Sequence, residues 1–259
     1  MKKRSIRKLT ASALGVVAAG LASGAWATTL YDLTQVGSSA TINGAIFTNP
    51  DNDTIVGTGV FDPFVRIEKT GSGNCDSPCV ERGYNTDGQP QFDTKAQQPG
   101  TNWVHSLLIS DISTVEIDGT VYREFFLDVN EANGGNPNDR YLSLDEFILF
   151  LGPVGNLDNY DEAANTLKSG DGTITATKIY DMDGAGDSAI GLDYDNFSGS
   201  GKGIDMVARV PDSLFTAPGS PQYVYLFSKF GGVGEVQASN TNHRPGLLSQ
   251  RDVDSLTTT

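Results

Sequence analysis

The residues of this chain that could do chemistry are mostly carboxylates and amides, and they gather in two stretches. In the first, Asp128, Asn130 and Glu131 precede a loop rich in Asn and Gly, and Asp145 follows it. Oxygen donors without His or Cys suit calcium, which takes about six to eight such ligands in a flexible geometry. The pattern therefore predicts a calcium-binding loop, and it favours binding over catalysis.

A second acidic stretch runs from residue 181 to residue 205. Asp side chains at alternate positions point to the same side of a strand, and like charges crowded there need a cation or a wide separation. An EF-hand loop is excluded, because the fifth position counted from Asp181 is Ala185 and the twelfth is Leu192. The alternative is that Asp and Gly form solvated Asx turns. Asp205 ends the stretch, and the predicted calcium ligands within it are Asp181, Asp183, Asp187, Asp193 and Asp195.

Catalysis has few candidates in this sequence. His105 and His243 are the only histidines, and no G-x-S-x-G nucleophile motif is present. A carboxylate pair such as Glu131 with Glu146 could serve a glycosidase, but only their separation and burial would decide this. We therefore predict a protein that is not an enzyme.

The first 27 residues differ from the rest of the chain. A basic start (residues 2–8), an apolar run (residues 11–22) and the small-x-small sequence Ala25-Trp26-Ala27 are typical of a secretory signal peptide. The apolar run is shorter than the ~20 residues of a membrane span. We therefore predict export to the cell surface or the extracellular space, cleavage after Ala27, and a mature chain from Thr28 without a membrane span.

Export changes how the charge and the cysteines are interpreted. The leader holds five basic residues and no acidic ones, so its removal takes the net charge from −14 to −19. Such a surface repels nucleic acid, which excludes nucleic-acid binding, and attracts cations. Cys75 and Cys79 form a C-x-x-x-C pair that favours a small disulfide closing a surface loop over a redox motif.

The elements that position the acidic stretches are predicted to be strands. Short β-branched and aromatic runs alternate with turn clusters, and Asp118-Gly119 between two such runs predicts a type I′ hairpin. Residues 142–151 favour a strand, although Ser143 and Glu146 also fit the capping box of a short helix. We predict an all-β protein: one antiparallel, jelly-roll-like β-sandwich over residues 28–231 with long acidic loops, and a loose tail over residues 232–259.

The strand predicted over residues 222–230 carries an aromatic row. Tyr223, Tyr225 and Phe227 share one face at period two, and an exposed row of this kind could stack on sugar rings. The opposite face is also apolar, which favours a central strand buried on both faces. A polysaccharide-binding module, and behind it a carbohydrate-active enzyme, are the alternatives to a structural protein.

Eight segments of the chain form a recurring pattern of strand-like runs and acidic turns, at residues 57–67, 83–88, 126–131, 142–146, 179–187, 192–206, 210–215 and 223–231. In these segments the chain resembles exported bacterial proteins of the PEP-CTERM sorting class. The resemblance implies a secreted or surface protein linked to exopolysaccharide and biofilm matrix, which makes extracellular polysaccharide one expected partner. A second copy of the chain, bound through uncovered edge strands, is another. Members normally end in a Pro-Glu-Pro motif, an apolar segment and a basic cluster. None of these is present here, so we expect a truncated or frameshifted C-terminus.

Overall fold

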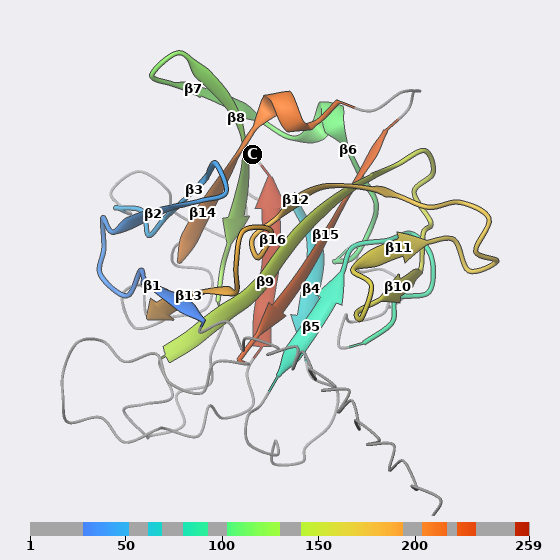
Figure 1. Cartoon of the computed structure of the whole chain (residues 1–259), viewed down its shortest axis with the longest axis horizontal. Coiled ribbons are helices and arrows are strands. Elements are labelled where there is room, and N and C mark those ends of the chain that lie inside the picture. Colours follow the sequence, from blue (N-terminus) through green and yellow to red (C-terminus); the bar gives the residue numbers. More distant parts are fainter. Residues whose placement is uncertain are drawn as a thin grey trace, which may run out of the picture.

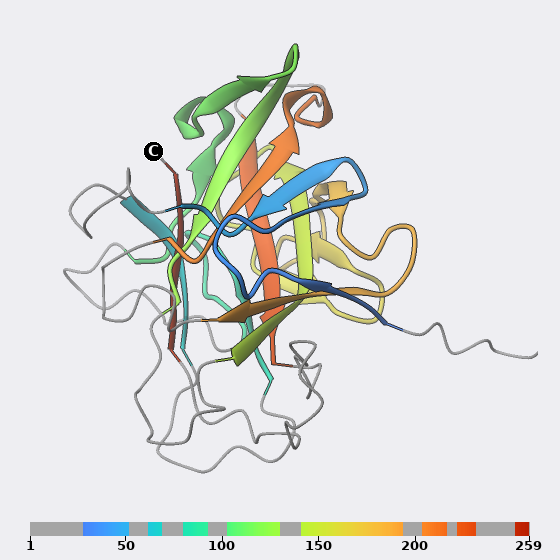
Figure 2. The ribbon, with the colours of Figure 1, turned by 90° about the vertical axis from the view of Figure 1, so that its left-hand side faces the viewer.

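The computed structural model describes residues 28–51, 62–68, 80–92, 103–129, 141–193, 204–216, 222–231 and 252–258. In these residues the chain folds as strands, with two short 3-10 turns, η2 (Ile109–Asp111) and η4 (Asp212–Leu214). Two seven-stranded, mainly antiparallel sheets pack together (Figures 1 and 2). The predicted all-β sandwich is confirmed.

Sheet A contains the longest strand, and its order across the sheet is β1 (Thr29–Asp32), β13 (Ser188–Asp193), β9 (Tyr141–Gly152), β15 (Tyr223–Phe230) and β5 (Glu81–Tyr84). In addition, β12 (Thr177–Asp181) pairs with β9, and β6 (Leu107–Leu108) pairs with β15. Residues 142–151 therefore belong to a central strand, and the alternative of a helix is wrong. Partners on both edges of β9 provide the backbone hydrogen bonds that favour the extended form.

Sheet B has the order β2 (Ser39–Ile42), β3 (Ala45–Thr48), β14 (Met206–Pro211), β8 (Thr120–Leu127), β16 (Asp252–Thr258) and β4 (Asp62–Glu68), with β7 (Thr114–Ile117) pairing with β8. The predicted hairpin joins β7 to β8, and Asp118 and Gly119 have φ of 50° and 79°. Both central residues thus adopt the positive φ of a type I′ turn, as predicted.

The C-terminal strand β16 differs from the loose tail expected over residues 232–259. Residues 252–258 pair with β8 on one side and with β4 on the other, and Figure 1 places β16 beside β4. Residues 232–251 lie outside the described residues. A weakly patterned segment becomes a strand here because two distant strands offer it backbone partners, which no local window of sequence reveals.

The main core lies between the two sheets. Its centre is aromatic: the ring of Phe147 from β9 meets Phe47 of β3 at 5.5 Å and Phe125 of β8 at 6.1 Å, in edge-to-face arrangements. All three side chains are fully buried. Because these contacts join sheet A to sheet B, they set the spacing between the layers from which the acidic loops project.

A second, smaller core covers the outer face of sheet A. The hairpin of β10 (Asn159–Asp161) and β11 (Thr166–Lys168) lies over β9 and β15. Tyr160 of this hairpin stacks on Phe227 with ring centres 4.1 Å apart and planes 20° apart. Strands β9 and β15 are therefore buried on both faces, as the apolar character of both faces of β15 predicted.

Candidate functional site

Three carboxylates from the two acidic stretches lie near enough for the charges of two predicted ligands, Asp128 and Asp193, to act on Asp205. Asp128 directly follows β8 of sheet B, Asp193 ends β13 of sheet A, and Asp205 directly precedes β14 of sheet B. The pairing of Met206 with Leu127 brings the start of β14 to the end of β8. Asn130, Glu131 and Asp195 lie outside the described residues.

Asp205 is the central residue of this group, which we call the Asp205 cluster (Asp128, Asp193 and Asp205). Its side chain is only 4% exposed. Its backbone N–H donates to the carbonyl of Leu127 at 2.9 Å, and its Oδ2 accepts the N–H of Val129 at 2.7 Å. The other carboxylate oxygen, Oδ1, is buried without a hydrogen-bond partner.

The electrostatics of the Asp205 cluster disfavour negative charge. Burial raises the pKa of Asp205 well above its usual value, and the charges of Asp128 and Asp193 raise it further, while the hydrogen bond from Val129 opposes them. Asp193 is itself only 3% exposed, and Asp128 is half-buried. Buried carboxylates near one another must take up a proton or be balanced by a cation.

A metal-binding group is not already assembled. Within the described residues, no three His, Cys, Asp or Glu side chains stand close enough to hold a metal ion as they are. A cation bound here would have to draw the three carboxylates of the Asp205 cluster inward. The two residues on sheet B are tied to adjacent strands, whereas Asp193 belongs to sheet A, so such a cation would bridge the two sheets.

Asp181 ends β12, Asp183 and Asp187 lie in the loop between β12 and β13, and the carboxylates of all three contact protein donors. Asp181 Oδ1 accepts the N–H of Asp183 at 3.0 Å, and its Oδ2 contacts Lys178 Nζ at 2.6 Å. Asp183 Oδ1 accepts the N–H of Ser188 at 2.9 Å. The bond from Asp183 to Asp181 has the spacing of an Asx turn, which the sequence left open as the alternative to calcium.

Asp183 differs from its neighbours in how far it is withdrawn from water. Its partial burial raises its pKa to about 6, and the negative charges of Asp187, Asp181 and Glu146 add to this, against the hydrogen bond from Ser188. Asp183 therefore changes charge in a range where an ordinary Asp is fully ionised.

Asp145 lies in the central strand β9. Lys229 pairs with Glu146 and Phe230 pairs with Leu144, so Asp145 is the extra residue of a bulge in β9. It is buried, and its charge acts on Lys229, whose ammonium contacts Glu146 Oε1 at 2.8 Å. Asp145 thus belongs to the outer face of sheet A.

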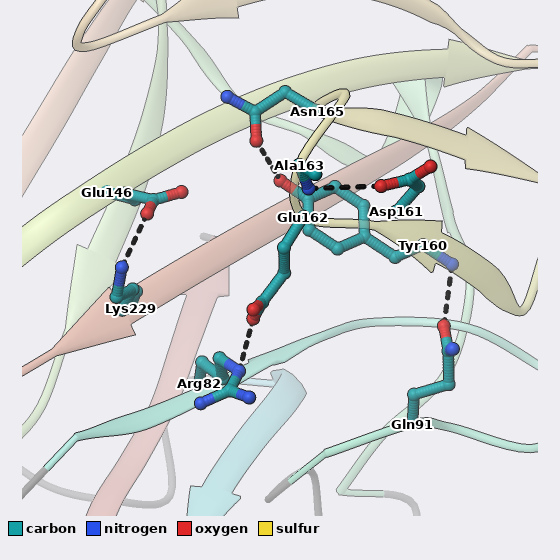
Figure 3. Close-up of polar contacts among 9 residues, drawn as sticks. All are labelled: Arg82, Gln91, Glu146, Tyr160, Asp161, Glu162, Ala163, Asn165 and Lys229. Atoms are coloured by element: carbon teal, nitrogen blue, oxygen red, sulfur yellow. Dashed lines mark hydrogen bonds and ion pairs between the residues drawn. The ribbon is translucent and has the colours of Figure 1, made fainter.

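The outer face of sheet A carries ion pairs beside the hairpin β10–β11. Figure 3 shows Glu146 with Lys229 and Glu162 with Arg82, while Tyr160 donates its O–H to Asn165 at 2.9 Å and its N–H to Gln91 at 2.6 Å. Glu146 therefore has a cationic partner, and the other member of the suggested glycosidase pair, Glu131, lies outside the described residues.

The aromatic row of β15 is not available to sugar rings. Tyr225 and Phe227 are 0% and 1% exposed, beneath the hairpin, and Tyr223 is half-buried. Tyr225 also uses its hydroxyl inside the fold, where it donates to the carbonyl of Val154 and accepts the N–H of Leu157. The row is therefore core, as the apolar opposite face of the strand favoured, and the alternative of a stacking surface is wrong for Tyr225 and Phe227.

Comparisons with protein-family models, with curated proteins and with solved structures find no match. Among the residues that the structure describes, no helix is long and apolar enough to span a membrane. The predicted disulfide partners Cys75 and Cys79 lie outside those residues. The function is therefore inferred from the side chains and contacts of this chain.

Asp205 lies in the second acidic stretch but is not among the calcium ligands that the sequence predicts. The missed signal is its context, Ile204-Asp205-Met206-Val207, in which a single carboxylate stands at the start of an apolar strand. A charge in that position is carried into the interior with the strand, and it then needs a partner there.

Proposed function

We propose that this chain is an exported, non-enzymatic β-sandwich protein of the cell surface or extracellular matrix, and that calcium bound by the Asp205 cluster stabilises its fold. The observation that supports this most strongly is the buried Asp205 Oδ1, which has no hydrogen-bond partner. Two further carboxylates, those of Asp128 and Asp193, lie near enough to act on its charge. A divalent cation would satisfy this oxygen and balance the shared charge.

Calcium fits this place better than other common ions. The three proposed ligands are carboxylates, which are hard oxygen donors, and two of them are tied to loops outside regular pairing. Calcium tolerates irregular geometry and variable coordination, whereas magnesium demands a near-ideal octahedron and releases its water reluctantly. A calcium ion shared by Asp193 of sheet A and Asp128 and Asp205 of sheet B would act as a cross-link between the layers.

Export is supported by the leader-like sequence of residues 1–27. Strand β1 begins at Thr29, two residues beyond the predicted cleavage point. The resemblance to the PEP-CTERM class supports association with the extracellular matrix, with polysaccharide or a second copy of the chain as partner. Because the aromatic row of β15 is buried, a polysaccharide partner would bind elsewhere.

Thermal unfolding of the mature chain tests the calcium proposal. At about 100 times its dissociation constant, calcium should stabilise the fold by roughly 2.7 kcal/mol, which corresponds to a rise of about 5 to 10 °C in the midpoint. The comparison is made with chelator and with the same concentration of magnesium. An unchanged midpoint, or an equal rise with magnesium, would contradict the proposal.

The variant Asp205→Asn assigns the effect to this site. It keeps an oxygen that can accept the N–H of Val129 but removes the buried charge, so the midpoint in chelator should rise while the response to calcium is lost. The matched control is Asp118→Asn in the β7–β8 turn, which removes one charge at a position where Asn suits the positive φ. A full calcium response in Asp205→Asn would refute the assignment.

A further inference from the structure

We propose that the α-amino group released by cleavage after Ala27 forms an ion pair with the carboxylate of Asp187 and thereby fastens strand β1 to strand β13. This inference rests on the proposed export, because the amino group exists only in the processed chain. It gives the loop between β12 and β13 a role separate from that of the Asp205 cluster: the chain's own terminus supplies a cation to this loop.

The contacts of Thr28 place the new terminus at Asp187. The Thr28 hydroxyl donates to Asp187 Oδ2, and the N–H of Thr29 donates to the Asp187 carbonyl at 2.8 Å. Only three covalent bonds separate the Thr28 hydroxyl oxygen from the Thr28 nitrogen, so the nitrogen lies within a few ångströms of the same carboxylate. Asp187 thus accepts one hydrogen bond from the Thr28 side chain and one from the Thr29 backbone.

The register of β1 holds this arrangement in place. Strand β1 runs parallel to β13, with Thr29 opposite Ser188 and Asp32 opposite Gly191. Beyond β1, the N–H of Leu33 donates to the Gly191 carbonyl at 2.9 Å, and Leu33 is buried in the main core. These bonds determine where the chain starts along β13, and Figure 1 shows β1 and β13 side by side at the edge of sheet A.

The charge of the loop calls for a cation at this point. Lys178 is engaged with Asp181 at 2.6 Å. Among the described residues, no ion pair joins Asp183 or Asp187 to Lys, Arg or His. The charge of Asp187 helps to raise the pKa of Asp183. Before cleavage Thr28 contributes a neutral amide, whereas after cleavage it contributes an ammonium group that favours the ionised form of both carboxylates.

Processing would therefore stabilise the edge of sheet A. Strand β1 has only four residues, and among the strands that the structure describes it pairs with β13 alone, so few hydrogen bonds hold it. Parallel pairs are slightly weaker per residue than antiparallel pairs. An ion pair at Thr28, directly before β1, would restrain the end of this strand against fraying. Strand β1 would then stay in place over the edge of β13.

The test compares mature chains that differ only at the terminus. One begins with a free Thr28, the second carries N-acetyl-Thr28, and the third retains Ala27 and so moves the ammonium by one residue. In chelator and low salt, the free chain should melt about 1 to 4 °C above the other two, because the pair is exposed. Equal midpoints for the free and acetylated chains would overturn the proposal.

Asp187→Asn identifies the partner of the ammonium group. In this variant the difference between free and acetylated chains should vanish, whereas Asp118→Asn should preserve it. The α-amino pKa gives a second readout, since it should lie above its ordinary value of about 7.7 to 8.0 in the free chain and return to it in Asp187→Asn. An unshifted amino pKa, or an acetylation effect that persists in Asp187→Asn, contradicts the ion pair.

Mass spectrometry of the exported protein separates this inference from the proposed function. A mature chain that starts at Thr28 supports both. Export with a start at another residue would overturn the ion pair and leave the exported calcium-binding protein intact. A chain that keeps its leader would overturn the export, and with it the ion pair.

Discussion

Replacing Tyr160 by Ala tests whether the outer face of sheet A is a second core or a binding surface. Tyr160 is 4% exposed and stacks on Phe227 at 4.1 Å. The rings of Tyr84 and Phe150 lie 6.1 and 6.0 Å from it. Its removal would leave a void among aromatic rings, and two of these, Phe150 and Phe227, belong to the central strands β9 and β15 and cannot collapse freely into it.

The magnitude follows from the two parts of the side chain. Emptying a buried aromatic site costs about 3 to 5 kcal/mol, and the lost hydrogen bond to Asn165 costs about 1 kcal/mol. We therefore expect Tyr160→Ala to lower the free energy of unfolding by about 4 to 6 kcal/mol. Tyr160→Phe keeps the ring and should lose only about 1 kcal/mol. The backbone bond from Tyr160 to Gln91 stays in both variants.

Urea unfolding of the mature chain, followed by fluorescence and circular dichroism, measures both losses. A loss below about 1 kcal/mol for Tyr160→Ala would refute the second core. A second result would also refute the second core: the wild-type chain binds a polysaccharide, and Tyr160→Ala abolishes this binding without loss of stability. The aromatic side chains would then act as a binding surface for sugars.

Three other predictions follow from single residues. In chelator, the folded pKa of about 6 for Asp183 lies above its value of 3.8 in the unfolded chain, so the folded state retains a proton that the unfolded state loses. The free energy of unfolding should therefore rise by about 1 kcal/mol, after allowance for solvent screening, as pH falls from about 6 to about 4. Thermal midpoints of the wild type and of Asp183→Asn are compared across this range. A difference between them that does not change with pH would contradict the prediction. Asn85→Ala should lower the free energy of unfolding in urea by about 3 kcal/mol, because this buried amide donates to the carbonyls of His105 and Val224 and accepts the N–H of Leu226. A loss under about 1 kcal/mol would show that these three hydrogen bonds contribute little to stability. Gly119→Ala should cost about 1 kcal/mol at φ of 79°, and Gly119→Asn less, as thermal melts would report; equal midpoints for Ala and Gly would contradict the turn.

Much of the fold was predictable because its signals are local. The Asp118-Gly119 turn lies between two strand-like runs, and its positive φ angles follow from the residues themselves. The double apolar faces of β15 predicted a central strand, since a run that is apolar on both sides must be covered on both. The choice of strand over helix for residues 142–151 followed from their aromatic and branched composition.

The grouping of the acidic residues could not be predicted in this way. Sequence reasoning joined Asp128 to Asp145 and Asp181 to Asp193, because they are neighbours along the chain. In the structure, Asp145 lies at a bulge of β9 and its charge acts on Lys229, while the pairing of β8 with β14 brings Asp128 near Asp205. Likewise, the strand character of residues 252–258 depends on pairing with β8 and β4.

The sequence by itself determined the strands, the tight turns, the acidic character and the leader-like start, because these depend on residues a few positions apart. Only the tertiary structure decided which carboxylates lose their water. The hydrogen bond from Val129 to Asp205 spans 76 residues of chain, and the aromatic row of β15 became core when a hairpin from another segment covered it. Desolvation depends on every segment that packs around a group, and this is a property of the assembled fold.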